Sequence, residues 1–143
     1  NVKGNLKSML DGIKGGWFPP LPETNNRRSM IHIDDLVSAI LFVSHKETSN
    51  GEVFIATDGR NYSSRDIYNI LCGLVNKKIP NWSIPNFIFD IISYLSPTIK
   101  FKVNKLLGDD FYSSEKLDKL GFKANKSLKD MNNISKINDR RLK

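Results

Sequence analysis

The chain has 143 residues, of which 39% are hydrophobic, and it carries a formal net charge of +7 at pH 7. This length and apolar fraction suffice for one modest domain. No apolar run approaches the roughly 18 residues that span a bilayer, and Cys72 is the only cysteine, so we predict neither a transmembrane helix nor an internal disulfide. No signal peptide opens the chain, and we expect a cytoplasmic protein without a membrane partner.

The first third of the chain predicts a helix, an extended segment and a strand. Apolar residues recur at helical spacing over 5–13, Asn5 can cap this helix, and a Gly-Gly pair ends it. The prolines of 17–22 (WFPPLP) favour an extended backbone. The alternation in 28–33 (RSMIHI) predicts a strand.

A mostly helical remainder follows. Asp34 is predicted to cap a helix whose apolar face includes Val37, Ile40 and Leu41, and 53–57 (VFIAT) reads as a short strand. Ser63 is predicted to cap the next helix, because an acidic residue stands in its first turn. The later helices are predicted over 85–95, 98–107, 114–120 and 127–137.

These elements indicate the α/β class, in a mostly helical form with a few short strands. Two or three strands cannot complete a doubly wound sheet. We therefore infer that they belong to a sheet whose remaining strands lie outside this chain.

Basic residues crowd the C-terminal end, at Lys123, Lys126, Lys129, Lys136, Arg140, Arg141 and Lys143. A basic tail can bind nucleic acid, whereas the simpler interpretation is a solvated surface with a flexible end. The tail has no interleaved aromatic residues and no nucleic-acid motif, so we favour the simpler interpretation and expect no nucleic-acid partner. We divide the chain into a domain over 1–132 and a basic, flexible tail over 133–143.

Several segments, in order, resemble landmarks of the extended short-chain dehydrogenase/reductase family, which includes the UDP-sugar 4-epimerases. They are 26–36 (NRRSMIHIDDL), 51–56 (GEVFIA), 63–64 (SS), 112–122 (YSSEKLDKLGF) and 127–130 (SLKD). The resemblance implies the C-terminal, substrate-binding portion of a Rossmann-type enzyme. The Pro-Leu-Pro stretch before Asn-Arg-Arg-Ser looks most like bacterial surface-polysaccharide enzymes of this group.

The family's cofactor and catalytic motifs are missing. The glycines of 12–16 have the wrong spacing for a dinucleotide-binding turn and follow a helix. A Tyr-x-x-x-Lys pattern occurs at Tyr112 and Lys116, but it falls in the closing segment and not at the family's catalytic position. We therefore assign no catalytic, cofactor-binding or metal-binding residue. NAD(P) would be bound by the missing N-terminal Rossmann domain of a full-length parent.

Arg28 is the strongest candidate for substrate binding. A guanidinium can hold a diphosphate through paired, charge-assisted hydrogen bonds, and the resemblance implies that Arg28 contacts the nucleotide diphosphate. The simpler alternative is an ordinary surface arginine. Arg27 would point to the opposite face of a strand, and is a weaker candidate.

The resemblance implies five further substrate-binding residues. Asn5 and Leu6 match the start of a substrate-side helix, and a helix N-terminus is a natural anion site. For Asn5 the alternative is a capping role alone. Phe18 is expected beside the nucleotide base, and Lys102 and Lys105 at a second phosphate contact.

The chain as given, which starts at Asn1 and not at a methionine, is thus expected to be a piece of an NAD(P)-dependent nucleotide-sugar epimerase, dehydratase or reductase. It should bind a UDP-sugar but be inactive alone, and it should expose apolar surface through which it can self-associate. The sugar, the reaction, the choice of NAD or NADP and the oligomeric state stay open. The alternative is a stand-alone basic module that binds nucleic acid or a protein partner.

Overall fold

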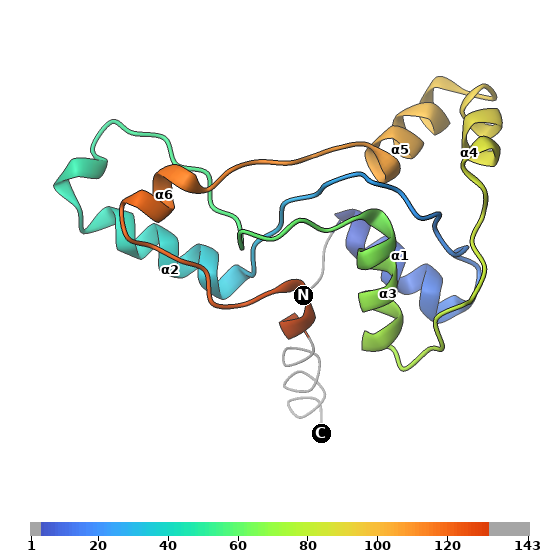
Figure 1. Ribbon diagram of the computed structural model, residues 1–143, viewed down its shortest axis with the longest axis horizontal. Coiled ribbons are helices and arrows are strands. Elements are labelled where there is room, and N and C mark those ends of the chain that lie inside the picture. The colour runs from blue at the N-terminus through green and yellow to red at the C-terminus, as the bar shows by residue number, and fades with distance from the viewer. Residues whose placement is uncertain (1–3, 132–143) are drawn as a thin grey trace. The chain divides into compact units, whose positions relative to one another are not determined.

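The computed structural model describes residues 4–131, which form helices joined by extended segments (Figure 1). Almost no strand is present among these residues, beyond isolated bridge positions at Arg28, Tyr62 and Asp110. The mostly helical character is confirmed. The α-helices are α1 (Gly4–Gly15), α2 (Ile33–Ser44), α3 (Ser64–Leu74), α4 (Asn86–Ser93), α5 (Pro97–Leu107) and α6 (Glu115–Lys119), and the short 3-10 helices are η1 (Glu47–Ser49) and η2 (Leu128–Met131).

The chain divides into two compact units. Among the described residues, the first unit contains 4–27 and 62–110, and the second contains 28–61 and 111–131. The predicted basic tail and most of the predicted last helix lie outside the described residues.

In the first unit, α1 and α3 pack against each other, and so do α4 and α5. The helix α1 ends where predicted, because Gly16 takes a positive φ of 77° that glycine adopts without strain. It begins at Gly4, so Asn5 lies inside its first turn and not at the cap as predicted. The buried apolar side chains of this unit include Met9, Ile13, Leu21, Ile67, Leu71 and Phe89.

The capping prediction for α3 is confirmed. The Ser63 hydroxyl accepts a hydrogen bond from the Asp66 N–H at 3.0 Å, and the Asp66 carboxylate accepts one from the Ser63 N–H at 2.9 Å. These two bonds satisfy backbone donors that a helix start leaves unpaired. The start of α3 is therefore set by four consecutive residues.

In the second unit, the strands predicted over 28–33 and 53–57 form no ladder among the described residues. The extended segment makes single bonds instead. The Met30 carbonyl accepts from the Asp58 N–H at 2.7 Å, and the Ser29 hydroxyl accepts from the Tyr112 N–H at 2.9 Å. Alternating residues favour a strand, but a ladder also needs a neighbouring strand over several residues.

The helix α2 departs from its prediction in two ways. It begins at Ile33 and is capped by His32, not by Asp34. Its expected apolar face is also not buried, since Ile40 and Leu41 are each 56% exposed.

The helix α6 is one residue shorter at each end than the predicted 114–120, with Ser114 and Leu120 as its capping positions. The Ser113 hydroxyl accepts from the Glu115 N–H at 3.2 Å, and Gly121 follows the helix with a φ of 106°.

Candidate functional site

The Pro-rich strap, residues 17–23, turns back over the end of α1. The N–H groups of Trp17 and Phe18 both donate to the Gly12 carbonyl, at 3.1 and 3.2 Å. A Cβ at position 12 would lie 2.8 Å from the Cβ of Phe18, a distance that real Cβ atoms do not tolerate. Gly12, which the sequence analysis did not single out, therefore lets the strap approach and sets the place of Phe18.

Arg65 is a buried cation that holds this strap, and sequence reasoning missed it. Its guanidinium donates to the carbonyls of Leu21 at 2.7 Å and Pro80 at 3.0 Å, and its Nε lies 3.4 Å from the Glu23 carboxylate. One signal was available, because Arg65 stands at helical spacing from Tyr68 and Cys72, which are also buried. The buried guanidinium therefore joins the strap to the loop that contains Pro80.

Aromatic rings continue the contact from Arg65 to Phe18. The Arg65 guanidinium lies 5.7 Å from the centre of the Tyr68 ring, which stacks on Phe18 with centroids 6.3 Å apart. Burial, together with a hydrogen bond to Cys72, raises the pKa of Tyr68 to about 12. The phenol is therefore neutral at physiological pH. Phe18 itself is half-buried, so part of its ring remains open to a ligand.

Asn26 links the end of the strap region to α3 and α5. Its amide oxygen accepts from the Ser64 N–H at 3.0 Å, and its amide nitrogen donates to the Ser64 hydroxyl at 2.9 Å and the Gly108 carbonyl at 3.2 Å. The Ser64 hydroxyl donates in turn to the Leu106 carbonyl. The C-terminal end of α5 is thus tied to the N-terminal end of α3.

The structure places five predicted residues in the first unit. Asn5 is exposed and Leu6 half-buried on the first turn of α1, and Phe18 lies in the strap. Lys102 and Lys105 are exposed on α5, with the Lys105 ammonium 6.0 Å from the centre of the Phe101 ring. Arg28, the sixth, belongs to the second unit and is half-buried.

Arg27 has a local anionic partner. Its N–H donates to the Asp109 carboxylate at 2.6 Å, its guanidinium lies 3.7 Å from the same carboxylate, and its carbonyl accepts from the Asp110 N–H at 2.8 Å. Asp109 therefore offsets the charge of Arg27.

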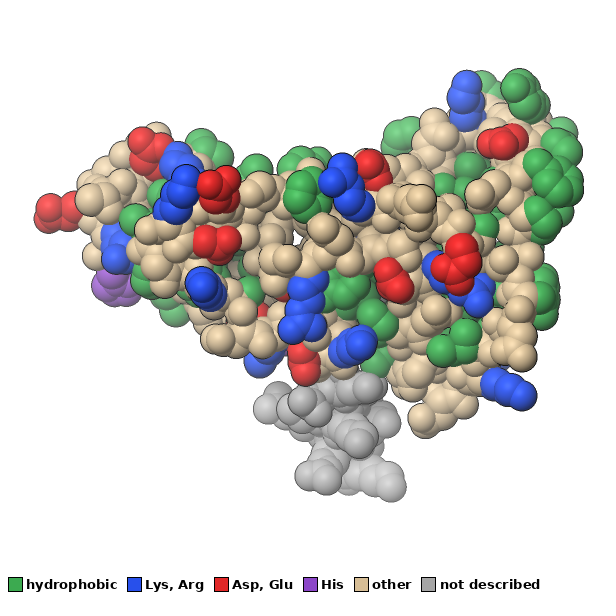
Figure 2. Space-filling model, viewed as in Figure 1, with side chains coloured by type: hydrophobic (Ala, Val, Ile, Leu, Met, Phe, Trp, Pro, Cys, Tyr) green, Lys and Arg blue, Asp and Glu red, His purple; other side chains and the backbone are tan. Residues whose placement is uncertain are grey.

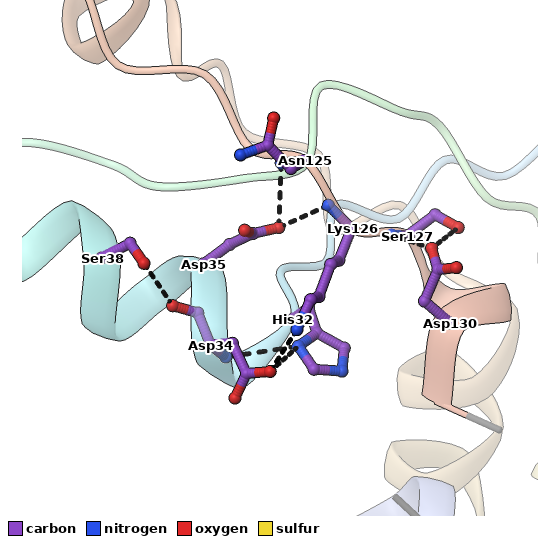
Figure 3. Close-up of polar contacts among 8 residues, drawn as sticks. All are labelled: His32, Asp34, Asp35, Ser38, Asn125, Lys126, Ser127 and Asp130. Carbon is purple, nitrogen blue, oxygen red and sulfur yellow. Dashed lines mark hydrogen bonds and ion pairs between the residues drawn. The ribbon is translucent and has the colours of Figure 1, made fainter. Parts of the chain in front are cut away.

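The motif that carries the family resemblance makes a polar junction in the second unit (Figure 3). His32 is buried, and its Nδ1 accepts from the Asp34 N–H at 3.2 Å. The buried Asp35 carboxylate accepts from the backbone N–H groups of Asn125 at 3.1 Å and Lys126 at 2.7 Å. Residues 32–35 (His-Ile-Asp-Asp) thus connect the start of α2 to residues 125–130, the closing segment of the described chain. Sequence reasoning missed this structural role of Asp35.

Two neighbouring carboxylates at this junction are held in the charged form. The hydrogen bond and ion pair with Lys126 lower the pKa of Asp34. Hydrogen bonds from the backbone and hydroxyl of Ser127, at 2.7 and 2.8 Å, lower the pKa of Asp130. The junction therefore depends on ionised carboxylates, and acid should weaken it.

The Tyr112-x-x-x-Lys116 pattern does not lie on one helix face, because Tyr112 precedes α6. Lys116 forms an ion pair with Glu52, donates to the Val53 carbonyl at 3.1 Å, and lies 4.9 Å from the centre of the Phe54 ring.

The glycines of 12–16 do not form a dinucleotide-binding turn. A bound pyrophosphate needs the N–H groups of a helix N-terminus, whereas Gly12, Gly15 and Gly16 lie at the C-terminal end of α1. The Gly12 carbonyl, moreover, already accepts two N–H groups of the strap. Across residues 4–131 no cluster of His, Cys, Asp and Glu could hold a metal ion. None of the helices described has the length and apolarity that a membrane crossing requires.

Two curated proteins match parts of the chain. It is 32% identical over 88 residues to a UDP-glucose 4-epimerase of Vibrio cholerae, which covers 59% of this chain and 25% of that protein. It is 23% identical over 133 residues to an N-acetyl-alpha-D-glucosaminyl-diphospho-ditrans,octacis-undecaprenol 4-epimerase of Escherichia coli O157:H7, which covers 85% of this chain and 40% of that protein. No family model and no solved structure matches the chain.

These partial matches support a relationship to the sugar 4-epimerases. The chain spans between a quarter and two-fifths of the length of the curated relatives it matches.

Proposed function

We propose that this chain is the nucleotide-sugar-binding portion of an NAD(P)-dependent sugar 4-epimerase that acts in bacterial surface-polysaccharide metabolism. The similarity to two proteins named as sugar 4-epimerases carries the proposal, since one match extends over 85% of the chain. The chain itself catalyses no reaction and binds no cofactor. Both tasks belong to the rest of a longer protein, in which an N-terminal Rossmann domain holds NAD(P).

The shared chemistry of the relatives' named substrates indicates what the site recognises. UDP-glucose and the diphospho-undecaprenol compound both carry a sugar on a diphosphate. In this chain, Arg28 supplies the paired guanidinium contact to the diphosphate, and Lys102 and Lys105 add positive charge.

The remaining residues recognise the rest of a UDP-sugar. Asn5 and Leu6 present the N-terminal turn of α1 to the diphosphate, and Phe18 borders the uracil ring. Local contacts support the last assignment, because Gly12, Arg65 and Tyr68 together hold Phe18 in place.

A second candidate substrate is a sugar carried on a polyprenyl diphosphate. The longer of the two matches is to a protein whose name specifies such a lipid carrier. This substrate keeps the diphosphate contact of Arg28 but removes the base that Phe18 would border. Replacing Phe18 by Ala would therefore weaken use of the UDP-sugar and leave use of the lipid-linked sugar unchanged.

The decisive experiment incubates the longer protein with NAD⁺ and UDP-glucose or UDP-N-acetylglucosamine, and identifies the products by NMR. Formation of the 4-epimer is the expected result, and this chain alone should form none. A longer protein that converts neither UDP-sugar nor the polyprenyl-linked sugar would refute the proposal. Calorimetry provides a second check, since micromolar NAD(H) binding by this chain alone would contradict the assignment of the cofactor to another domain.

A further inference from the structure

The hairpin of α4 and α5 exposes an unusual amount of apolar surface. Hydrophobic side chains gather over this part of the molecule, at upper right in Figure 2. Tyr94 and Leu95, at the turn between the two helices, are 90% and 73% exposed. Transfer of such apolar side chains from water to an apolar environment is favourable, so large exposed patches often mark binding surfaces.

Exposed apolar residues run along α4 into the turn after it. Phe87 and Ile91, at i, i+4 spacing on α4, are each about 60% exposed, Asp90 is exposed beside them, and Tyr94 and Leu95 follow directly after the helix. Phe89 is the buried side chain of this helix. The helix therefore has an inward side that holds the hairpin together and an outward side that nothing in this unit covers.

The second helix of the hairpin, α5, is basic. Lys100, Lys102 and Lys105 are exposed on α5, where Lys105 and the 66%-exposed Phe101 share one face. Over residues 77–107 the chain has five lysines against a single acid, Asp90. Such a surface suits the boundary between lipid headgroups and acyl chains. Aromatic rings can lie at this boundary, and a lysine can bury its alkyl stem there while its ammonium group stays among the headgroups.

We propose that the α4–α5 hairpin is a membrane-docking element, which inserts Tyr94 and Leu95 into the headgroup region of an anionic bilayer while the lysines of α5 contact the lipid phosphates. The proposal concerns binding to the surface of a bilayer and not a helix that crosses it. We expected no membrane partner because the chain lacks a long apolar run, but such a run is needed only for a helix that crosses the bilayer. Lys102 and Lys105 also belong to the proposed diphosphate site, whereas Tyr94, Leu95 and Lys100 belong to the hairpin surface alone, so binding to vesicles without UDP tests this proposal separately.

The charge pattern favours a bilayer over a protein partner for this surface. The exposed apolar stripe of α2, formed by Ile33, Val37, Ile40 and Leu41, provides the comparison. The α2 helix contains Asp34 and Asp35 and no basic residue, so it offers anionic lipid no positive charge of its own. Of the two exposed apolar surfaces, only that of the hairpin is complementary to a negatively charged membrane.

The test is flotation of the full chain with vesicles of phosphatidylcholine alone or of equal parts phosphatidylcholine and phosphatidylglycerol. We expect binding to the anionic vesicles, with salt weakening it. The double variant Tyr94→Ser, Leu95→Ser should bind about ten-fold more weakly. Replacing lysines 100, 102 and 105 by Gln should cost about five-fold in affinity for each lysine removed.

The matched control is Ile40→Ser, Leu41→Ser, which removes two exposed apolar residues from α2. It should leave vesicle binding unchanged. If this control lost as much vesicle binding as the hairpin variant, any exposed apolar surface would bind the vesicles, and the proposal would be overturned. Equal binding to neutral and anionic vesicles would also overturn it. If the chain bound no vesicles but self-associated, and the hairpin variant abolished that self-association, the surface would be a protein interface and the proposal would be wrong.

A spectroscopic measurement locates the inserted residues. Cys72 is 1% exposed, so a thiol-reactive dye should label a new surface cysteine selectively. An environment-sensitive dye on Leu95→Cys should shift to the blue on anionic vesicles, whereas the same dye on Ser38→Cys of α2 should not. A shift at position 38 without one at 95 would contradict the proposed orientation.

Discussion

The buried guanidinium of Arg65 donates a hydrogen bond of 2.7 Å to the carbonyl of Leu21, and so fixes the strap on which Phe18 lies. A second bond, to the Pro80 carbonyl, ties a separate loop to the same side chain. A cation at the start of α3 therefore sets the position of a residue that we place in the nucleotide site.

Replacing Arg65 by Met should destabilise the chain by about 2 to 4 kcal/mol, because two carbonyls lose their donor while the side-chain volume is nearly kept. Urea unfolding measures this change. The exposed Arg60 is the control, since Arg60→Met should change the free energy of unfolding by less than about 0.5 kcal/mol. Equal stability of the two variants would show that the Arg65 bonds contribute nothing.

Gly12→Ala should displace the strap, because the added Cβ would meet Phe18 at 2.8 Å. We expect a loss of stability of about 1 to 3 kcal/mol and a weaker affinity for UDP. Gly73→Ala in α3 is the matched control. Its Cβ would meet nothing within 4 Å, so it should stabilise the helix by about 0.5 to 1 kcal/mol. Thermal melts and UDP calorimetry on both variants provide the test, and an unaffected Gly12→Ala would contradict the packing.

Arg28→Ala in the longer protein should lower kcat/KM for the UDP-sugar about 30- to 1000-fold, because a phosphate charge loses its paired donor. The affinity for UDP alone should fall as well, since the contact is to the diphosphate. Arg28→Lys should recover only part of the loss, because a point charge cannot make the paired contact.

Arg27→Ala is the control for this series. Arg27 already has Asp109 as an ionic partner, so its removal should cost much less UDP affinity. Thermal melts of all three variants confirm that they fold. A larger effect at Arg27 than at Arg28 would mean that the diphosphate lies elsewhere.

Acid should open the junction between α2 and the closing segment. Folding lowers the pKa of Asp34 and Asp130 below the ordinary value of 3.8. Their contribution to stability is therefore present above that value and is lost as the pH falls through the lower, folded-state pKa. Melting temperatures from about pH 5 to about pH 2 should drop accordingly.

The variants Asp34→Asn and Asp130→Asn should flatten this acid dependence, at the cost of lower stability at neutral pH. Ser38→Ala, a change on the exposed side of α2, should keep the full acid dependence. An acid limb that is the same in Asp34→Asn, Asp130→Asn and the unchanged chain would show that these carboxylates do not control it.

Local patterns in the sequence predicted the helices well. The capping box of Ser63 and Asp66 and the glycines after α1 and α6 each act within one turn of the backbone. Such interactions depend on residues only a few positions apart, so they can be predicted from the sequence.

What needed the tertiary structure involves partners far apart in the chain. Asp35 accepts hydrogen bonds from residues about ninety positions later, Asn26 reaches Gly108, and Arg65 reaches Leu21. The strand predictions failed for the same reason, since alternation sets the faces of a strand while its ladder depends on a neighbour that the sequence does not name. The sequence by itself determined where α3 starts and where α1 and α6 stop. Only the folded chain decided which polar groups meet and which apolar faces stay uncovered, because a hydrogen bond or a buried contact forms between groups that the tertiary structure brings together.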